Sequence, residues 1–264
     1  MNALMKKTIL ILGGSSEGFA LAERLEANPA YRPISSLAGR TSLPRKPVGA
    51  YRTGGFGGPE GLANYIQTEN ISALIDATHP FAQNISSNAN QAAKSVNCPI
   101  IHISRPEWQK QKGDHWIEVS SMQDAATALS PELSPAFLTI GRLELSAFLH
   151  REDISFFCRA IEAPKQTDPK KQKISNPMKE DEWPDNFNFI YAKGPFSYRD
   201  EKALFEQHNF KAIVTKNSGG EKARAKLDVA RDLRLPVIMI NRPKTPGDQT
   251  VQTIDEALNW LENL

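Results

Sequence analysis

The first candidate for chemistry is a glycine turn, Gly13-Gly14-Ser15-Ser16-Glu17-Gly18, which follows the apolar run Thr8–Leu12. Such a turn lets backbone N–H groups approach a pyrophosphate, and the N-terminus of the helix expected after it adds about half a positive charge. The usual dinucleotide fingerprint has glycine at its first, third and sixth positions, whereas here Ser15 stands third. A plain tight turn is the alternative. We expect the cofactor to contact Gly13, Gly14, Ser15, Ser16 and Glu17.

The residues after the second expected strand, Pro33–Ala38, bear on the choice of cofactor. They are Gly39-Arg40-Thr41-Ser42. A site specific for NAD usually has Asp or Glu at this point, to accept hydrogen bonds from the ribose hydroxyls. A guanidinium with two hydroxyls suits a 2′-phosphate instead, so Gly39, Arg40 and Thr41 favour NADPH. NADH stays possible, because Arg40 could be an ordinary surface arginine.

Two further segments of the N-terminal half resemble ligand loops. Thr53-Gly54-Gly55-Phe56-Gly57-Gly58 has four glycines in six residues, which suggests backbone close to a ligand at Gly55, or else a flexible loop. Asp76, Thr78 and His79 follow the strand Ala73–Ala77, at the edge where open parallel sheets bind ligands. We expect Thr78 to contact the cofactor and His79 to bind substrate or move a proton. Alternatively, Asp76 caps the next helix and His79 is structural.

Basic residues recur at expected strand ends in the C-terminal half. Lys216-Asn217-Ser218-Gly219-Gly220 combines a cation, two polar side chains and glycines before a helix, which is typical of an anion site. Arg142 follows Gly141, and Lys193 precedes Gly194-Pro195. We expect Arg142, Lys193 and Lys216, with Asn217, Ser218 and Gly219, to bind an acidic substrate. The alternative is that each is structural.

Strands alternating with helices predict parallel sheets covered on both faces. The fold class is therefore α/β, with two Rossmann-like domains and an interdomain cleft. We place a nicotinamide-binding domain at residues 1–104 and a substrate-binding domain at residues 105–264. Lys165–Asp185 is polar and aperiodic, which favours a solvated loop over a flap.

Composition narrows the function classes. Among 264 residues, 32 Lys and Arg balance 30 Asp and Glu, and this near-neutral charge disfavours a nucleic-acid-binding module. Two distant cysteines, Cys98 and Cys158, indicate neither a disulfide framework nor a metal site. The apolar run at Thr8–Leu12 is too short for a signal core or membrane span, so we expect a cytoplasmic protein that is a monomer or small homo-oligomer.

These motifs, in this order, resemble the precorrin-6A reductase family, which includes cobalt-precorrin-6A reductases. The resemblance extends from about residue 8 to residue 243. The matching segments are Ile11–Gly14 with Glu17-Gly18, Leu37–Thr41, Gly54–Gly58, Asp76–Ala82, Arg105-Pro106, Thr139–Arg142, Lys193–Phe196 and Lys216–Gly220.

The resemblance implies a reductase of corrin biosynthesis that transfers a hydride from NADPH to carbon 19 of precorrin-6A, a tetrapyrrole, and adds a proton at carbon 18. The acetate and propionate groups of that substrate suit the basic residues described above. Asp76, His79 and Lys216 are the catalytic candidates. The alternatives are a cobalt-precorrin-6A reductase that uses NADH, and a regulator that binds NADP without turnover.

Overall fold

The computed structural model describes residues 6–39, 45–161, 183–247 and 249–264. It forms two compact units, one of Met1–Pro106 with Pro243–Leu264 and the other of Glu107–Arg242. Within the described ranges, no helix is long and apolar enough to cross a membrane. Most of the expected polar loop, residues 165–182, lies outside the described residues.

The first unit is built on a six-stranded parallel sheet in the order β12-β5-β4-β1-β2-β3. With β12 in sixth place, this is the strand order of a doubly wound Rossmann-like fold. The order reverses between β1 and β4, where such sheets bind ligands. The strands are β1 (Lys7–Leu12), β2 (Tyr31–Leu37), β3 (Ala50–Thr53), β4 (Ile71–Asp76), β5 (Ile100–Ile103) and β12 (Thr250–Val251).

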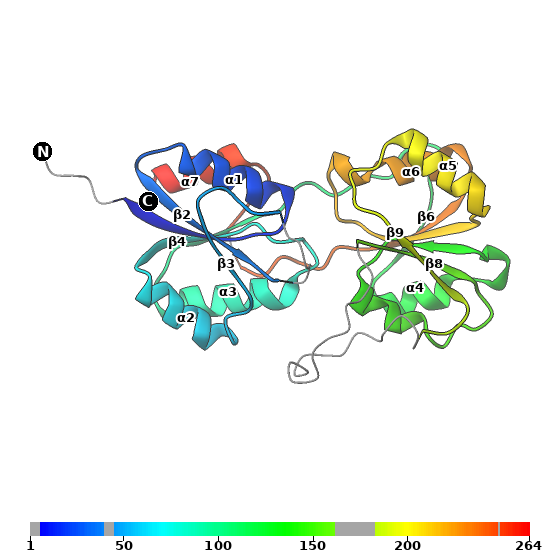
Figure 1. Ribbon diagram of the computed structural model, residues 1–264, viewed down its shortest axis with the longest axis horizontal. Helices are drawn as coiled ribbons and strands as arrows, with labels where there is room; N and C mark the ends of the chain where they lie inside the picture. The colour runs from blue at the N-terminus through cyan, green and yellow to red at the C-terminus, as the bar shows by residue number, and fades with distance from the viewer. Residues whose placement is uncertain (1–5, 40–44, 162–182, 248) are drawn as a thin grey trace, which may run out of the picture. The chain divides into compact units, whose positions relative to one another are not determined.

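Alternating side chains of β1 bury both faces of this sheet. Ile9 and Ile11 pack with residues of α1 (Ser16–Glu26) and α7 (Ile254–Glu262), whereas Leu10 and Leu12 pack with residues of α2 (Pro59–Thr68) and α3 (Gln83–Ser95). The two helix pairs lie on opposite sides of the sheet (Figure 1). Complete burial of successive residues is the reason that this strand reads as an uninterrupted apolar run.

The C-terminal segment belongs to the first unit, whereas the sequence placed residues 105–264 together. β12 pairs with the free edge of β5, and Ala257 and Leu261 of α7 are fully buried in the first core. Gln83 and Asn90 of α3 also donate hydrogen bonds to the carbonyls of Lys244 and Pro246, at 3.1 Å each. Burial of the apolar face of α7 therefore returns the chain to its starting sheet.

The second unit contains another six-stranded parallel sheet, in the order β6-β11-β10-β7-β8-β9. Its strands are β6 (His115–Val119), β7 (Ala136–Leu138), β8 (Phe156–Ala160), β9 (Phe187–Tyr191), β10 (Ala212–Lys216) and β11 (Pro236–Ile240). The strand order reverses between β7 and β10. Two parallel sheets with covering helices confirm the expected α/β class.

Helices cover both faces of this second sheet. α5 (Tyr198–His208) and α6 (Ala225–Asp232) lie on one side, and α4 (Met122–Ala128) lies on the other (Figure 1). The segments after Gly141 and Gly220 are 3-10 turns, η2 (Arg142–Phe148) and η5 (Glu221–Ala223), with a further turn at η1 (Pro131–Leu133). The α-helix expected directly after Gly219-Gly220 begins only at Ala225, so the glycines after Lys216 open a 3-10 turn and not an α-helix.

Candidate active site

The glycine turn lies at the switch point of the first sheet. The Ser15 hydroxyl accepts a hydrogen bond from Gly18 N at 3.0 Å and donates one to Ala77 O, at the end of β4, at 2.5 Å. A Cβ on Gly18 would stand 3.1 Å from Gly13 Cα, so glycine allows α1 to approach the turn closely. Ser15 thus caps the helix and ties the ends of β1 and β4 together, while backbone groups form the open face of the turn.

Glu17, in the first turn of α1, forms an ion pair with Arg105 at 3.0 Å. Partial burial raises the pKa of Glu17, but the charge of Arg105, together with hydrogen bonds from the Glu17 backbone, Arg105 and Ser15, outweighs burial and leaves the pKa below its ordinary value. The paired guanidinium offsets the carboxylate charge beside the helix N-terminus. Arg105 appeared in the sequence only as part of a family motif, and the structure gives it this partner.

Glycines bring the ends of β2 and β3 together. Gly54 N donates to Leu37 O at 2.9 Å, and a Cβ on Gly39, whose φ is +71°, would stand 3.5 Å from Gly54 N. Gly55 is exposed on the loop after β3. Arg40 and Thr41 lie outside the described residues, so their expected role stays a prediction.

Asp76, at the end of β4, is buried and has several partners. Its Oδ1 accepts hydrogen bonds from Thr78 N at 3.0 Å and Thr78 Oγ1 at 2.7 Å, and its Oδ2 lies 2.9 Å from His102 Nδ1. His102 Nε2 lies 2.9 Å from Asn90 Nδ2 on α3. This buried chain fixes the segment that carries Thr78 and His79. It does not cap α3, which begins at Gln83.

His102 is a residue that the sequence analysis missed. It faces Asp76 across the register of β4 and β5, and only 2% of it is exposed. One signal was present in the sequence, since a single histidine interrupts the apolar strand Ile100–Ile103. His79, by contrast, is exposed, and its Nδ1 accepts a hydrogen bond from Phe81 N at 3.3 Å.

The Asp76–His102 pair gives a stability prediction. We expect His102→Gln and Asp76→Asn each to lower the free energy of unfolding by about 1.5–3 kcal/mol, the range for a hydrogen bond to a charged group. Because each variant breaks the same interaction, the double variant should lose much less stability than the sum of the two single losses. Denaturant unfolding of the four proteins measures this coupling, and strictly additive losses would contradict it.

The same pair should make the stability of the protein depend on pH. Burial raises the pKa of Asp76, but hydrogen bonds from His102, Ser86 and Thr78 outweigh it and leave the pKa below the ordinary 3.8. The stability from the carboxylate is therefore complete above that value and is lost as the pH falls through the lower pKa of the folded state. The stability difference between the wild type and Asp76→Asn should therefore shrink as the pH falls below 3.8.

Lys216 and Glu144 meet at the switch point of the second sheet. Lys216, the last residue of β10, donates a hydrogen bond to Glu144 Oε1, and Gly141 N donates to Glu144 Oε2 at 2.7 Å. The Lys216 side chain is 13% exposed. Arg142 lies beyond the end of β7, with its guanidinium 6.0 Å from the Phe189 ring centroid, and Lys193 is exposed beyond the end of β9. Because the strands are parallel, all three basic residues lie on the same side of this sheet, beyond the carboxyl ends of its strands.

Asn217 has a structural role in addition to any binding role. Its side-chain amide accepts a hydrogen bond from Trp108 N at 2.8 Å and donates to Trp108 O at 3.1 Å, and its backbone carbonyl accepts one from Arg242 Nε at 3.2 Å. It therefore joins Trp108, near the start of the second unit, and Arg242, its last residue, to the end of β10. Ser218 and Gly219 are also buried, and Ser218 N donates to Lys216 O at 2.7 Å.

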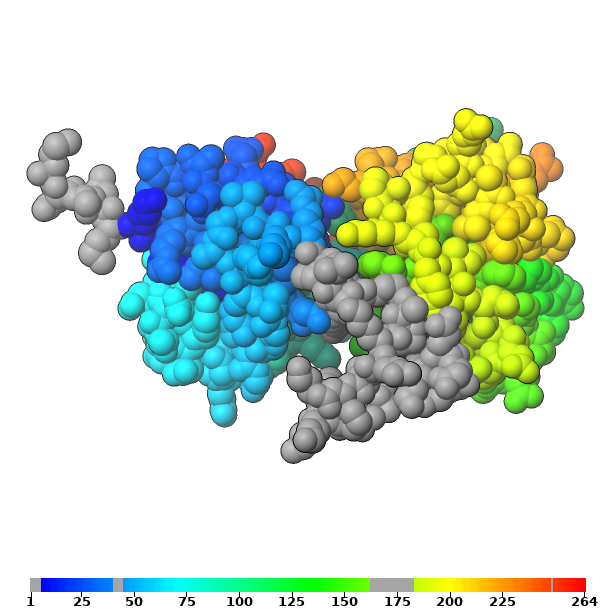
Figure 2. Space-filling model, viewed as in Figure 1, coloured from blue at the N-terminus to red at the C-terminus, as the bar shows by residue number. Residues whose placement is uncertain are grey.

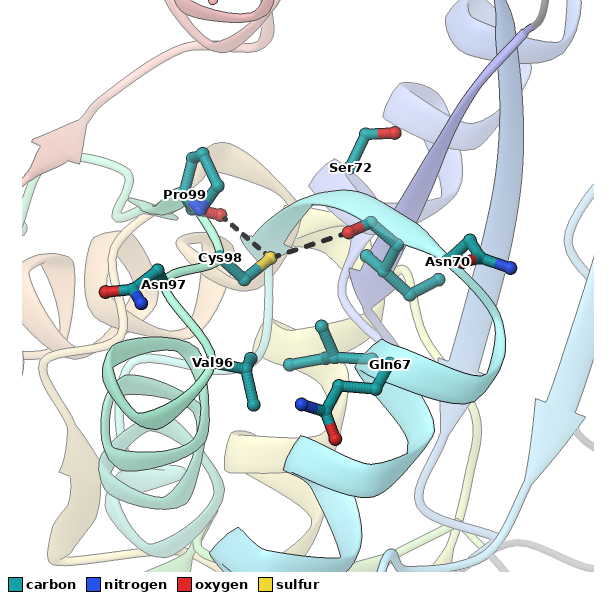
Figure 3. Close-up of a pocket in the computed structure, with 9 residues that line it drawn as sticks. Gln67, Asn70, Ser72, Val96, Asn97, Cys98 and Pro99 are labelled. Atoms are coloured by element: carbon teal, nitrogen blue, oxygen red, sulfur yellow. Dashed lines mark hydrogen bonds between the residues drawn. The ribbon is translucent and has the colours of Figure 1, made fainter.

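The hollow drawn in Figure 3 is separate from both switch points. It has a volume of about 350 Å³ and lies at the amino-terminal ends of β4 and β5, next to Ile71, Cys98 and Pro99. Burial raises the pKa of the Cys98 thiol to about 11, so the thiol is protonated at neutral pH and is a poor nucleophile. In the described part of the chain, no cluster of three or more His, Cys, Asp or Glu could hold a metal ion.

The fold and its glycine turn define a Rossmann-like α/β protein, and comparisons with known proteins give its family. Residues 8–262 match the family described as precorrin-6x reductase CbiJ/CobK. A precorrin-6A reductase of Rhodococcus erythropolis is 41% identical over 97% of this chain and 98% of its own length. A cobalt-precorrin-6A reductase of Priestia megaterium is 27% identical, with the same two coverages.

Solved structures agree with this result. The structure of a CobK precorrin-6A reductase matches with a TM-score of 0.85 at 33% identity, over 97% of this chain and 96% of the other. The chain belongs to the precorrin-6x reductase CbiJ/CobK family. It is therefore a reductase of cobalamin biosynthesis, as the resemblance implied.

Proposed function

We propose that the protein reduces precorrin-6A with NADPH, by hydride transfer to carbon 19 and protonation at carbon 18. Cobalt-free substrate is favoured because the full-length identity is 41% to the Rhodococcus precorrin-6A reductase and 27% to the Priestia cobalt-precorrin-6A reductase. The observation that supports a dinucleotide cofactor is the position of the glycine turn at the β1–β4 switch point. NADPH is a cytoplasmic reductant, so the proposal places the reaction in the cytoplasm.

The residues of the turn fit a dinucleotide. Among the residues that the structure describes, and apart from its chain neighbours, no heavy atom lies within 4 Å of where a Cβ of Gly14 would stand, which leaves room for a pyrophosphate against the start of α1. In a sheet of this order the ribose then lies at the end of β2, beside Gly39, and the residues that follow in the sequence, Arg40 and Thr41, are proposed to contact it. The nicotinamide end would lie toward β4, near Thr78 and His79, and would supply the hydride when bound.

The second unit is proposed to bind the tetrapyrrole. Arg142, Lys193 and Lys216 place positive charge at one sheet edge although the whole chain carries only +2, and carboxylates are the groups that such an edge would bind. Of the three catalytic candidates, Asp76 is 3% exposed and its carboxylate contacts Thr78 and His102. The exposed imidazole of His79 is therefore better placed to exchange a proton with a bound ligand.

The cofactor preference gives a further prediction. Arg40→Ala should raise the Michaelis constant for NADPH by about ten- to hundredfold and leave that for NADH nearly unchanged, since it removes a charge-assisted contact to the 2′-phosphate. Steady-state kinetics with each cofactor measures this. An equal rise in the Michaelis constants for NADPH and NADH would show that Arg40 is structural. The preference for NADPH would then have no support from the sequence.

An absorbance assay tests the proposed function as a whole. The purified protein should oxidise NADPH only when precorrin-6A is supplied, and more slowly with NADH. Oxidation at the same rate with and without the tetrapyrrole would contradict the proposal. Binding of NADP without any turnover of precorrin-6A or cobalt-precorrin-6A would favour a regulator instead.

A further inference from the structure

Arg52 organises the loop that follows β3. Its guanidinium donates hydrogen bonds to Ser36 Oγ on β2 and to the carbonyls of Gly54 and Gly55, each at 2.9 Å. The same group lies 3.9 Å from the Phe56 ring centroid and 5.3 Å from that of Tyr65 on α2. Both terminal nitrogens and a face of the guanidinium are thus used within the protein, so Arg52 holds the loop in place.

The glycines of this loop are only partly explained by the protein itself. Gly54, Gly57 and Gly58 have φ angles of +104°, +82° and +100°, which favour glycine. Gly55 has no such φ, and apart from its two chain neighbours no heavy atom of the described residues lies within 4 Å of where its Cβ would stand. Neither backbone strain nor packing within the described chain requires glycine there, and a ligand occupying that space would.

The position of the loop indicates which part of a bound dinucleotide would contact it. The register places Ser36 beside Arg52 and Leu37 beside Thr53, so the loop adjoins the end of β2. A dinucleotide whose pyrophosphate lies at β1 and whose ribose lies at β2 has its adenosine on the side of β3. In Figure 2 the mid-blue atoms of residues near 50 lie at the surface of the first unit, as expected of an edge that a ligand can reach.

We propose that Gly54–Gly58 forms the wall of the cofactor site against the adenosine end, and that Arg52 is the positioning residue of that wall. This inference rests on the proposed function. Arg52 acts by holding the backbone of Gly54 and Gly55, not by binding the 2′-phosphate. Its geometry, two terminal nitrogens that each reach a carbonyl together with a planar face on an aromatic ring, is one that lysine cannot reproduce.

Calorimetry with 2′,5′-ADP, which represents the adenosine end alone, tests this proposal. Gly55→Ala introduces no strain or clash, and we expect it to weaken binding by about tenfold or more with an unchanged melting temperature. Arg52→Met and Arg52→Lys should both weaken 2′,5′-ADP and raise the KM for NADPH, with kcat at saturating NADPH within about twofold of the wild type. Arg24→Met is the matched control, because Arg24 is exposed and pairs with Asp255.

The outcomes distinguish a failure of the adenosine wall from a failure of the cofactor assignment. Unchanged 2′,5′-ADP affinity in Gly55→Ala would overturn this inference alone, whether or not the Arg52 variants fold. Full binding by Arg52→Lys would show that the charge matters and the geometry does not, which also overturns the positioning role. Failure of the wild type to bind 2′,5′-ADP or NADPH would overturn the cofactor assignment itself, and this inference with it.

Discussion

Gly13→Val is expected to abolish NADPH binding, with a loss of affinity of at least about a hundredfold, or roughly 2.7 kcal/mol. A Cβ on Gly13 would lie 3.8 Å from Leu37 Cδ2 and from Ser36 O, so the new side chain points toward the end of β2. That is the space between the expected pyrophosphate and ribose positions. Isothermal titration calorimetry on the folded variant measures the loss.

A Cβ on Gly13 alone makes only ordinary van der Waals contacts at 3.8 Å, and Gly13 has no positive φ, but the two Cγ atoms of valine extend beyond that Cβ. Thermal unfolding of Gly13→Val is therefore the control, because only a folded variant tests the cofactor site. Unchanged NADPH affinity in a folded variant would move the cofactor site away from the first glycine turn.

Lys216→Ala is expected to reduce turnover or substrate affinity by about tenfold or more, the effect of losing a charged hydrogen bond. NADPH affinity measured without substrate should change little, because Lys216 lies in the second unit and the glycine turn lies in the first. The ion pair with Glu144 is part of the same prediction. Glu144→Gln keeps an acceptor for Gly141 N and leaves the lysine in place, so it should have the smaller effect.

Lys202→Ala is the matched control for Lys216. Lys202 lies in the same unit, has an exposed side chain and pairs only loosely with Glu206 at 3.9 Å, so its removal should leave kinetics and stability unchanged. A collapse of NADPH affinity in folded Lys216→Ala would assign Lys216 to the cofactor site. It would also reverse the roles proposed for the two units.

The strands that the sequence revealed and those that it did not differ in burial. Interior strands such as β1, β4 and β10 are buried on both faces and appear as apolar runs. β3, β6 and β12 were missed, and each lies at an edge of its sheet with mostly exposed residues or only two residues. The return of α7 to the first unit depends on the free edge of β5, which no local pattern encodes.

The local features of the candidate site could be predicted from the sequence, because glycine and charge patterns are local, whereas its long-range side-chain contacts could not. The glycine turn lies at the switch point of the first sheet, and Arg142 and Lys216 lie at that of the second, whereas Lys193 lies beyond the edge strand β9. Ser15 and Asn217 bond to residues 62 and 109 positions away, and those partners give each a structural role that spacing does not reveal. Arg52 and His102 were missed for the same reason.

The most direct test of the account follows the hydride. Precorrin-6A is incubated with the enzyme and NADPH that carries deuterium at both positions of nicotinamide carbon 4, and the product is analysed by mass spectrometry and NMR. Hydride transfer from NADPH would give one deuterium per molecule, at carbon 19, and a proton at carbon 18 that comes from solvent. A reduced product whose carbon 19 hydrogen comes from solvent would contradict hydride transfer and the proposed function with it.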